Sequence, residues 1–434
     1  MSTEQVYKQF LQSAGISTDT RAEVRNTLFF ALKGDQFDGN RFVEDALKNG
    51  CRLAITERKE LEGDSRVIFV PSSLLLLQEL ARYHREQVSP RLVAITGSNG
   101  KTTTKELMAA VLSRKYKVAA TRGNLNNHIG VPLTLLSMKN EEVAVIEMGA
   151  NHPGEIAKLA AIALPEAGVI TNVGKAHLEG FGSLQGVLDA KGELYDFLAA
   201  HDGRALVDGT DKVLLQKAEN SGTNTLVIGP GGDLPVGAEL VRQSPFLEVK
   251  ITFGDEVHHC TTRLVGTYNL QNMILAAGVG LYFGVPSAEI AAAMAAYRPE
   301  NQRSQLVEGN RNRMVLDSYN ANPSSMREAI GALLTYASSS PTMLILGDMA
   351  ELGDASLQEH RELVEWIGSL DVDRVLLVGP NFHKVCEPSS STDVFRERKE
   401  LESFLVEERP EGYLVLVKGS RVMELERIAP LLTD

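Results

Sequence analysis

Three apolar runs in the middle of the chain constrain its fold most strongly. "LVAIT" at 92–96, "VAVIEMG" at 143–149 and "AGVITNVG" at 167–174 are almost continuously hydrophobic and end in polar residues and glycine. Such runs are typical of parallel strands that are buried on both faces of a sheet. Helical stretches separate them, so the pattern predicts a central parallel α/β unit with its function at the carboxyl ends of the strands.

The flanking regions show two further α/β patterns. Before residue 89, three short runs predict the strands of a small mixed α/β unit: "TLFFAL", "CRLAIT" and "RVIFV". After residue 299, strand-like runs alternate with helical stretches, as in an open Rossmann-like sheet: "RMVLD", "TMLILG", "RVLLVG" and "YLVLVKG". We therefore expect an α/β protein with three domains, at residues 1–88, 89–298 and 299–434.

The region between residues 204 and 265 differs from the rest. Segments such as "LEVKITF" and "TTRLVG" alternate apolar and polar residues, and glycine-rich turns separate them. Alternation is typical of strands with one solvated face, which are usually antiparallel. We expect an antiparallel part here, at the end of the central domain, before the helix in "NLQNMILAAGVGLYFG".

Composition narrows the possible partners. The chain has 434 residues and a formal net charge of -12, which argues against duplex nucleic acid because neutralising phosphates needs a basic surface. The three cysteines are scattered and form no CxxC pair, so we expect no disulfide framework and no zinc–cysteine site. No apolar run approaches the ~20 residues that a membrane span needs. These features favour a cytoplasmic protein, which we expect to be a monomer.

The loop "ITGSNGKTTTK" at residues 95–105 joins the first central strand to a helix. The strict Walker pattern requires a glycine at the position of Ile95, but the shorter G-S-N-G-K-T keeps the parts that bind phosphate. Backbone amides can hold phosphate oxygens, Lys101 brings a positive charge, and Thr102 offers a hydroxyl to magnesium. The alternative is a glycine turn that only connects a strand to a helix. The candidate phosphate-binding residues are Gly97, Ser98, Asn99, Gly100, Lys101, Thr102 and Thr103.

Two other polar residues follow central strands. Glu147 ends "VAVIE", and a carboxylate beside a phosphate loop is a natural ligand of Mg²⁺, which prefers oxygen donors. The alternative role is a carboxylate that is satisfied by a helix N-terminus. His177 follows the next strand, in "TNVGKAHLEGFGS", at the same predicted sheet edge. Lys191, in "LDAKGELYDFL", would by default be an exposed lysine on a helix.

Polar clusters also end three strands of the last domain, at 317–323, 347–349 and 418–421. One such cluster has a simple structural explanation, since Asn322 and Pro323 can form a turn into a helix that Ser324 caps. Three clusters at one sheet edge indicate a site, because the carboxyl ends of parallel strands converge.

Nine segments together resemble the Mur ligases, over nearly the whole chain and in the same order: "TGSNGKTTTKE", "GNLNNHIGVPLTLL", "IEMGANHPGEI", "TNVGKAHLEGFGS", "AKGEL", "GTYNLQNMILA", "DSYNANPSSM", "LGDMAELG" and "VKGSR". Near the start, "STDTR" and "LKGDQFDGNRF" are similar to the family's UDP-binding domain. "DSYNANPSSM" and "LGDMAELG" are most similar to members that act on D-alanyl-D-alanine. The resemblance implies that ATP drives the joining of D-alanyl-D-alanine to UDP-N-acetylmuramoyl-tripeptide through an acyl phosphate, in peptidoglycan precursor synthesis.

The resemblance also implies roles for individual residues. Lys101, His177 and Lys191 would be catalytic, with Lys191 carbamylated. Thr102 and Glu147 would hold one Mg²⁺, and His177 with Lys191 a second. The further ATP contacts would be Asn269, Asn272, Arg303 and Asp317. The UDP substrate would contact Arg21, Asn124, Asn126 and Asn127. The peptide, or the closed arrangement of domains, would involve Asn320, Asn322, Lys418 and Arg421.

Some features depart from the family pattern, and two other functions stay open. "VDGTD" at 207–211 stands where relatives often carry an asparagine and paired acids, and His128 stands where a glutamate is common. The roles of Asp208, Asp211 and His128 are therefore open. One alternative function is a ligase of the same superfamily that adds one amino acid or extends folate. The other is a P-loop regulator that binds nucleotide and joins nothing. The sequence does not say whether the tripeptide carries lysine or diaminopimelate.

Overall fold

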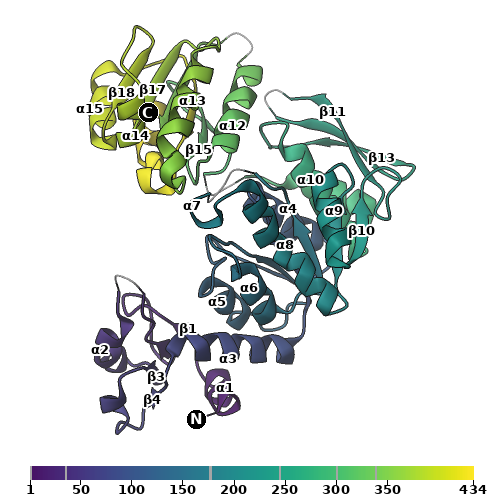
Figure 1. The fold of residues 1–434 in the computed structure, drawn as a ribbon, viewed down its shortest axis with the longest axis vertical. Coiled ribbons are helices and arrows are strands. Elements are labelled where there is room, and N and C mark those ends of the chain that lie inside the picture. The colour runs from purple at the N-terminus through teal and green to yellow at the C-terminus, as the bar shows by residue number, and fades with distance from the viewer. Residues whose placement is uncertain (1, 35–36, 175–177, 244–245, 300–301, 338–339) are drawn as a thin grey trace.

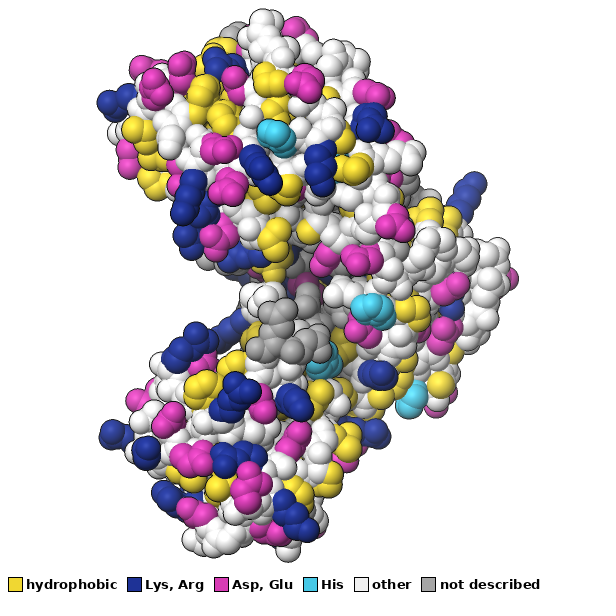
Figure 2. All heavy atoms as spheres, turned by 60° about the vertical axis from the view of Figure 1, so that its left-hand side comes forward, with side chains coloured by type: hydrophobic (Ala, Val, Ile, Leu, Met, Phe, Trp, Pro, Cys, Tyr) yellow, Lys and Arg dark blue, Asp and Glu magenta, His cyan; other side chains and the backbone are white. Residues whose placement is uncertain are grey.

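The structure is a computed structural model that describes residues 2–34, 37–174, 178–243, 246–299, 302–337 and 340–434. It arranges the chain in three successive α/β parts, with the N-terminal part at one end of an elongated molecule and the C-terminal part at the other (Figure 1). A hollow separates these two ends on one face (Figure 2). Within the described parts of the chain, every helix is too short or too polar to span a bilayer.

The N-terminal part contains a parallel sheet in the order β1-β2-β3-β4. Its strands are β1 (Ile16–Ser17), β2 (Leu28–Phe30), β3 (Leu53–Thr56) and β4 (Val67–Phe69). Its helices are α1 (Thr3–Leu11), η1 (Gly39–Phe42), α2 (Val43–Lys48), η2 (Lys59–Leu61) and α3 (Ser73–Val88). The three strands predicted from apolar runs are all present, and a shorter β1 is added at the edge.

Helix α3 joins the N-terminal part to the central part. Ser72 caps it by accepting a hydrogen bond from the Leu75 amide, and its buried face continues into one core that includes both parts. His84 lies between them: Tyr7 of α1 is 3.1 Å from its Nδ1, and its Nε2 is 2.9 Å from the Met138 carbonyl oxygen. Arg85 Nε donates to the Ala163 carbonyl at 2.9 Å. These buried contacts fix the N-terminal part to the central one.

The central part is built on a parallel sheet in the order β10-β9-β8-β5-β7-β6. Its strands are β5 (Arg91–Thr96), β6 (Val118–Ala120), β7 (Val143–Glu147), β8 (Ala167–Ile170), β9 (Arg204–Asp208) and β10 (Asn224–Ile228). Its helices are α4 (Lys101–Leu112), α5 (Gly130–Leu136), α6 (Glu155–Ala163), α7 (Leu178–Phe181), α8 (Leu184–Ala200), α9 (Lys212–Ser221), α10 (Asn269–Tyr282) and α11 (Ser287–Ala296). Since β5 lies between β7 and β8, the loops after these three strands meet at one edge, where α/β sheets bind ligands.

The antiparallel part is smaller than the sequence pattern predicts. It consists of β11 (Val236–Arg242), β12 (Glu248–Phe253) and β13 (Glu256–Thr261), whereas β9 and β10 extend the parallel sheet. The prediction of a strand in "TTRLVG" is wrong beyond its first residue. After Thr261 the regular strand ends, and the Thr262 hydroxyl donates to the Leu247 carbonyl and accepts from the Leu264 amide. The apolar residues that follow pack into the core from a loop.

The C-terminal part has a sheet in the order β14-β15-β19-β16-β17-β18, parallel except for β14. Its strands are β14 (Gln305–Glu308), β15 (Arg313–Asp317), β16 (Thr342–Gly347), β17 (Arg374–Val378), β18 (Thr392–Phe395) and β19 (Leu414–Lys418). Its helices are α12 (Pro323–Tyr336), η3 (Gly353–Ala355), α13 (Ser356–Ile367), α14 (Pro380–Val385), α15 (Arg398–Glu408), η4 (Arg421–Met423), η5 (Leu425–Ile428) and α16 (Ala429–Thr433). The four predicted strands are present, and the pattern missed the edge strands β14 and β18.

Candidate active site

The loop between β5 and α4 requires glycine at two positions. Gly97 has a φ of +144°, and a Cβ there would lie 1.9 Å from Thr171 Oγ1. Gly100 has a φ of +77°, and a Cβ there would lie 2.5 Å from Asn272 Oδ1. L-residues with side chains rarely adopt these backbone angles, so both glycines are needed for the turn and for its close packing. Helix α4 starts directly after Gly100, with its amides facing the loop.

The loop is fixed to the segment after β8. The Ser98 amide donates to the Asn172 carbonyl at 3.0 Å, and the Asn99 amide donates to Asn172 Oδ1 at 2.9 Å. Thr171 Oγ1 donates to the Asn99 carbonyl at 2.6 Å. These bonds fix the backbone of the loop before any phosphate binds, so little reorganisation of the backbone is needed on binding.

Lys101 folds over this loop. Its Nζ donates to the carbonyls of Gly97 at 2.7 Å and Ser98 at 3.1 Å. Burial lowers the pKa of Lys101 below its ordinary value, and the negative charge of Glu147 offsets part of this effect. A bound phosphate would offer this ammonium a charged acceptor in place of two carbonyls, which strengthens its hydrogen bonds.

Glu147 ends β7 with its side chain 2% exposed. Thr102 Oγ1 donates to its Oε2 at 2.8 Å, and Asn126 Nδ2 donates to its Oε1 at 2.8 Å. Lys105 Nζ is 3.9 Å from Oε2. A hydroxyl and a carboxylate side by side at a phosphate loop suit Mg²⁺, which completes its coordination with phosphates and water. In the part of the chain that the structure describes, no three His, Cys, Asp or Glu side chains cluster at metal-binding range.

Lys191 of α8 is buried, with 1% of its surface exposed, and is not the exposed lysine that its helical position alone predicts. Its Nζ donates to the Ala150 carbonyl at 3.3 Å and lies 5.1 Å from the centre of the Phe181 ring. Burial, and secondarily the positive charge of Lys101, lowers the pKa of Lys191 to about 7. His177 lies outside the described residues.

Asn269 and Asn272 form a buried chain of hydrogen bonds between α4 and α10. Thr104 Oγ1 donates to Asn272 Oδ1 at 3.0 Å, and Asn272 Nδ2 donates to Asn269 Oδ1 at 2.8 Å. Asn269 Nδ2 in turn donates to the Val265 carbonyl at 2.8 Å. Asn272 reaches the cavity described below, whereas Asn269 supports it from behind.

Residues of the C-terminal part face the phosphate loop. Asp317 and Lys418 end the neighbouring strands β15 and β19 in direct register, and Lys418 Nζ donates to Asp317 Oδ2 at 2.6 Å. Lys418 also donates to the Asn320 carbonyl at 3.0 Å. Asn322 caps α12 through its Oδ1, so the predicted cap at Ser324 is wrong and Ser324 lies inside the first turn. Asn322 Nδ2 donates to Asn99 Oδ1 at 2.8 Å. This last bond connects the C-terminal part directly to the loop.

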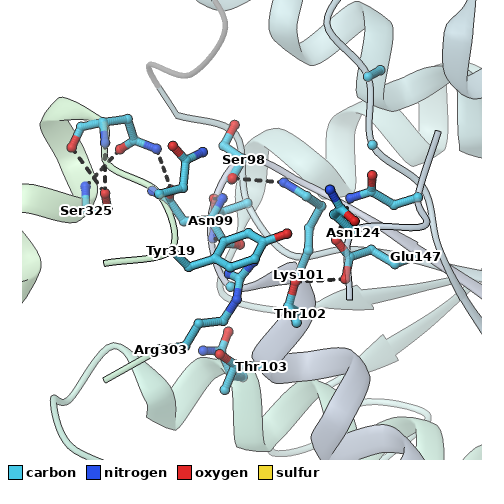
Figure 3. A pocket seen from close by; sticks show the side chains of 18 of the residues that line it. Ser98, Asn99, Lys101, Thr102, Thr103, Asn124, Glu147, Arg303, Tyr319 and Ser325 are labelled. Atoms are coloured by element: carbon cyan, nitrogen blue, oxygen red, sulfur yellow. Dashed lines mark hydrogen bonds between the residues drawn. The ribbon is translucent and has the colours of Figure 1, made fainter. Parts of the chain in front are cut away.

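These elements enclose a cavity of about 590 Å³ between the central and C-terminal parts (Figure 3). Most of the predicted site residues line it: Ser98, Asn99, Gly100, Lys101, Thr102, Thr103, Asn124, Asn126, Asn127, Glu147, Asn272, Arg303, Asp317, Asn320, Asn322 and Lys418. Further lining residues were not predicted: Asn151, Glu155, Lys158, Asn172, Tyr268, Gln271, Ser304, Tyr319, Ser325, Glu328 and Glu351. Most of these residues lie inside the quoted segments, so membership in those segments was the signal that could have found them.

Among the described residues, five predicted ones do not line the cavity: Arg21, Gly97, Lys191, Asn269 and Arg421. Arg21 is exposed on the N-terminal part, where it pairs with Asp19 at 2.7 Å. Arg421 bonds Glu426 at 3.0 Å and Gln302 at 3.2 Å.

The three residues with open roles have structural partners. Asp208 accepts hydrogen bonds from Thr210 and from Gln271 Nε2, which lies 3.3 Å away. Asp211 caps α9. His128 lines the cavity, and its carbonyl accepts from Gln78 of α3 at 3.0 Å.

The strand, glycine loop and helix, with a carboxylate beside them and a second α/β part opposite, define a nucleotide-dependent enzyme of the P-loop class. Three family descriptions match in succession: "Mur ligase family, catalytic domain" at 13–85, "Mur ligase middle domain" at 95–280, and "Mur ligase, glutamate ligase domain" at 302–421. The chain belongs to the Mur ligase family.

Full-length relatives agree with this assignment. The UDP-N-acetylmuramoyl-tripeptide–D-alanyl-D-alanine ligase of Bacillus subtilis (strain 168) is 35% identical over 433 residues, which is 95% of this chain and 92% of the relative. The crystal structure I of MurF from Acinetobacter baumannii has a TM-score of 0.87 at 32% identity and covers 100% of this chain and 98% of that one. The MurF ligase of Thermotoga maritima in complex with ADP has a TM-score of 0.84 at 30% identity, with 98% of each chain covered.

Proposed function

We propose that the chain joins D-alanyl-D-alanine to UDP-N-acetylmuramoyl-tripeptide, with cleavage of ATP to ADP and phosphate, in peptidoglycan precursor synthesis. The observation that carries the proposal is similarity along the whole length to ligases of this name. The identity of the chain as a ligase of the Mur family argues against a regulator that joins nothing. A member that adds one amino acid or extends folate is the remaining alternative.

The first step activates a carboxylate. An oxygen of the tripeptide's terminal carboxylate attacks the γ-phosphorus of ATP, the bond to the β–γ bridging oxygen breaks, and ADP leaves. Lys101 would move from its two carbonyls to the phosphates, and Arg303, which lines the same cavity, would add a second positive charge. Thr102 and Glu147 would hold Mg²⁺, which neutralises phosphate charge when it is bound.

The second step forms the amide. The free amine of D-alanyl-D-alanine attacks the carbon of the acyl phosphate, phosphate leaves, and the nitrogen loses a proton. No covalent bond to the protein is needed, so the task of the chain is to position reactants from different parts. Asp317, Asn320, Asn322 and Lys418 are placed at the edge that faces the loop, where peptide and nucleotide would meet.

Lys191 is proposed to carry a carbamate that holds a second Mg²⁺ together with His177. Carbon dioxide reacts only with a neutral amine, and burial lowers the pKa of Lys191 to about 7, so this amine is largely neutral in mildly alkaline buffer. We expect K191A to be weakly active and partly restored by acetate, and the wild type to lose activity in carbon-dioxide-free buffer. A fully active K191A variant would contradict this role.

The UDP end of the substrate is proposed to lie toward the N-terminal part, with Arg21, Asn124, Asn126 and Asn127 as contacts. Lysine and arginine side chains stand on both sides of the hollow that this substrate would enter (Figure 2). We also propose that the domains are divided after residues 88 and 298. The protein is further proposed to be a monomer and to be located in the cytoplasm. A reducing compartment suits the three free cysteines.

One assay separates the candidate functions. We expect release of phosphate from ATP only when both UDP-N-acetylmuramoyl-tripeptide and D-alanyl-D-alanine are present, with a UDP-pentapeptide as the product. Replacement of D-alanyl-D-alanine by single amino acids should abolish the reaction. Equal turnover with one amino acid, or with a folate substrate, would refute the proposal in favour of another ligase of the family.

A further inference from the structure

Arg303 stands on a short segment with an unusual backbone. The residues on its two sides, Gln302 and Ser304, have φ angles of 60° and 49°. Residues with side chains rarely occupy this left-handed region, and they persist there only where their surroundings fix the conformation. Two such residues around one arginine indicate that the chain is bent to aim that side chain.

Contacts on both sides fix the bend. The Ser304 amide donates to Asp317 Oδ1 at 3.1 Å, and the Ser304 hydroxyl is 2.6 Å from the hydroxyl of Tyr268 in the central part. Arg421 Nη1 donates to Gln302 Oε1 at 3.2 Å. The backbone around Arg303 is therefore attached both to the C-terminal sheet and to the central part.

The side chain of Arg303 rests on an aromatic ring. Its guanidinium carbon is 3.8 Å from the centre of the Tyr319 ring, and the two side chains project together into the cavity beside Lys101 and Thr103 (Figure 3). Arg303 Nε is buried, and it has no hydrogen-bond partner among the described residues. A guanidinium that stacks on a ring keeps its N–H groups free at the edge of its plane, where they can reach phosphate oxygens.

We propose that Tyr319 is a positioning residue for the reaction: its ring holds the Arg303 guanidinium in the orientation that binds the phosphate chain of the nucleotide. Tyr319 acts only through Arg303 and makes no essential contact with the nucleotide itself. The inference rests on the proposed nucleotide site and adds to it a residue of "DSYNANPSSM" to which the sequence analysis gave no role. The ring is the working part, so phenylalanine can replace tyrosine and an aliphatic side chain cannot.

A double-mutant cycle tests this role, with ADP affinity measured by isothermal titration calorimetry on the full-length protein. The variants are Y319L, R303M, the combined Y319L/R303M, and Y319F as the conservative control. We expect Y319L to weaken ADP binding about tenfold, because an unstacked arginine must be ordered on binding. Y319F should stay within about twofold of the wild type, and the combined variant should bind no more weakly than R303M alone.

The cycle also separates this role from two others. If Y319L weakens binding by the same factor with and without Arg303, the ring either contacts ADP directly or only supports the fold, and the inference fails. It fails as well if Y319F is as weak as Y319L, because the hydroxyl would then be the important group. A wild-type protein that binds no ADP would overturn the proposed function and this inference together.

Discussion

Removal of the negative charge from Asp317 should destabilise the C-terminal part strongly. Lys418 Nζ is 2.6 Å from Asp317 Oδ2, and the two side chains are 3% and 15% exposed. Breaking a buried ion pair by removing one partner costs about 3–5 kcal/mol, because the other charge stays buried without compensation. In D317N the Lys418 ammonium keeps its hydrogen bond to the Asn320 carbonyl, which is 3.0 Å long in the wild type. The partial exposure of position 317 also allows solvent to screen the charge of Lys418. We therefore expect a loss of about 2–3 kcal/mol.

Differential scanning calorimetry measures this loss as a shift of the transition that belongs to the C-terminal part. For a unit of roughly this size, 1 kcal/mol corresponds to about 3–4 °C, so D317N should lower the transition by roughly 6–12 °C. The matched control is D317N/K418M, which removes the uncompensated ammonium as well. The double variant should regain part of the lost stability, because methionine fills the space of lysine without its charge.

Two results would refute this reasoning. A D317N transition within about 2 °C of the wild type would mean that solvent already screens the pair. A double variant that melts below D317N would mean that Lys418 stabilises the sheet edge by packing, independently of the charge of Asp317.

Three further predictions concern the site. K101A should reduce turnover by about 10²-fold or more while the melting temperature stays close to that of the wild type, and near-normal turnover would remove Lys101 from phosphoryl transfer. Burial lowers the pKa of Lys191 from 10.5 to about 7 in the folded protein. In carbon-dioxide-free buffer between these two pH values, the unfolded chain therefore binds more protons than the folded one. The free energy of unfolding should then rise with pH across this window. Chemical denaturation of K191M should show a smaller rise, and an unchanged slope would contradict the burial effect. An ATP analogue with UDP-tripeptide should lower the radius of gyration in solution scattering, because both parts line the cavity, and identical profiles would argue against a hinge near residue 299.

The sequence was most informative where structure depends on local pattern. The strands β5, β7 and β8 and the two strained glycines follow from apolar runs and from a loop motif of a few residues. The sequence analysis predicted that the ends of the C-terminal strands lie at one edge of the sheet, and Asp317 and Lys418 are indeed neighbours there. These features depend on backbone geometry that neighbouring residues determine almost alone.

Contacts between distant segments could not be predicted in the same way. Lys191 is buried because it contacts Ala150, which lies 41 residues before it in the chain, and the ring of Phe181. Tyr319 faces Arg303 only after the segment at 302–304 bends. The pattern of apolar and polar residues along the chain does not predict such tertiary contacts, because they depend on how helices, strands and loops pack against one another.

The shared core at helix α3 has a mechanical consequence. One cluster of buried residues runs from α1 to α9 and joins the first two parts, which also have a separate cluster each, whereas no such cluster joins the C-terminal part to them in the described residues. The first two parts should then unfold as one cooperative unit and move as one rigid arm. Under the proposed function, the rigid connection of these two parts fixes the distance between the bound nucleotide-sugar and the phosphate loop. A peptide shorter than three residues would leave its carboxylate short of the γ-phosphate, so selection by length would follow from the rigidity of one helix.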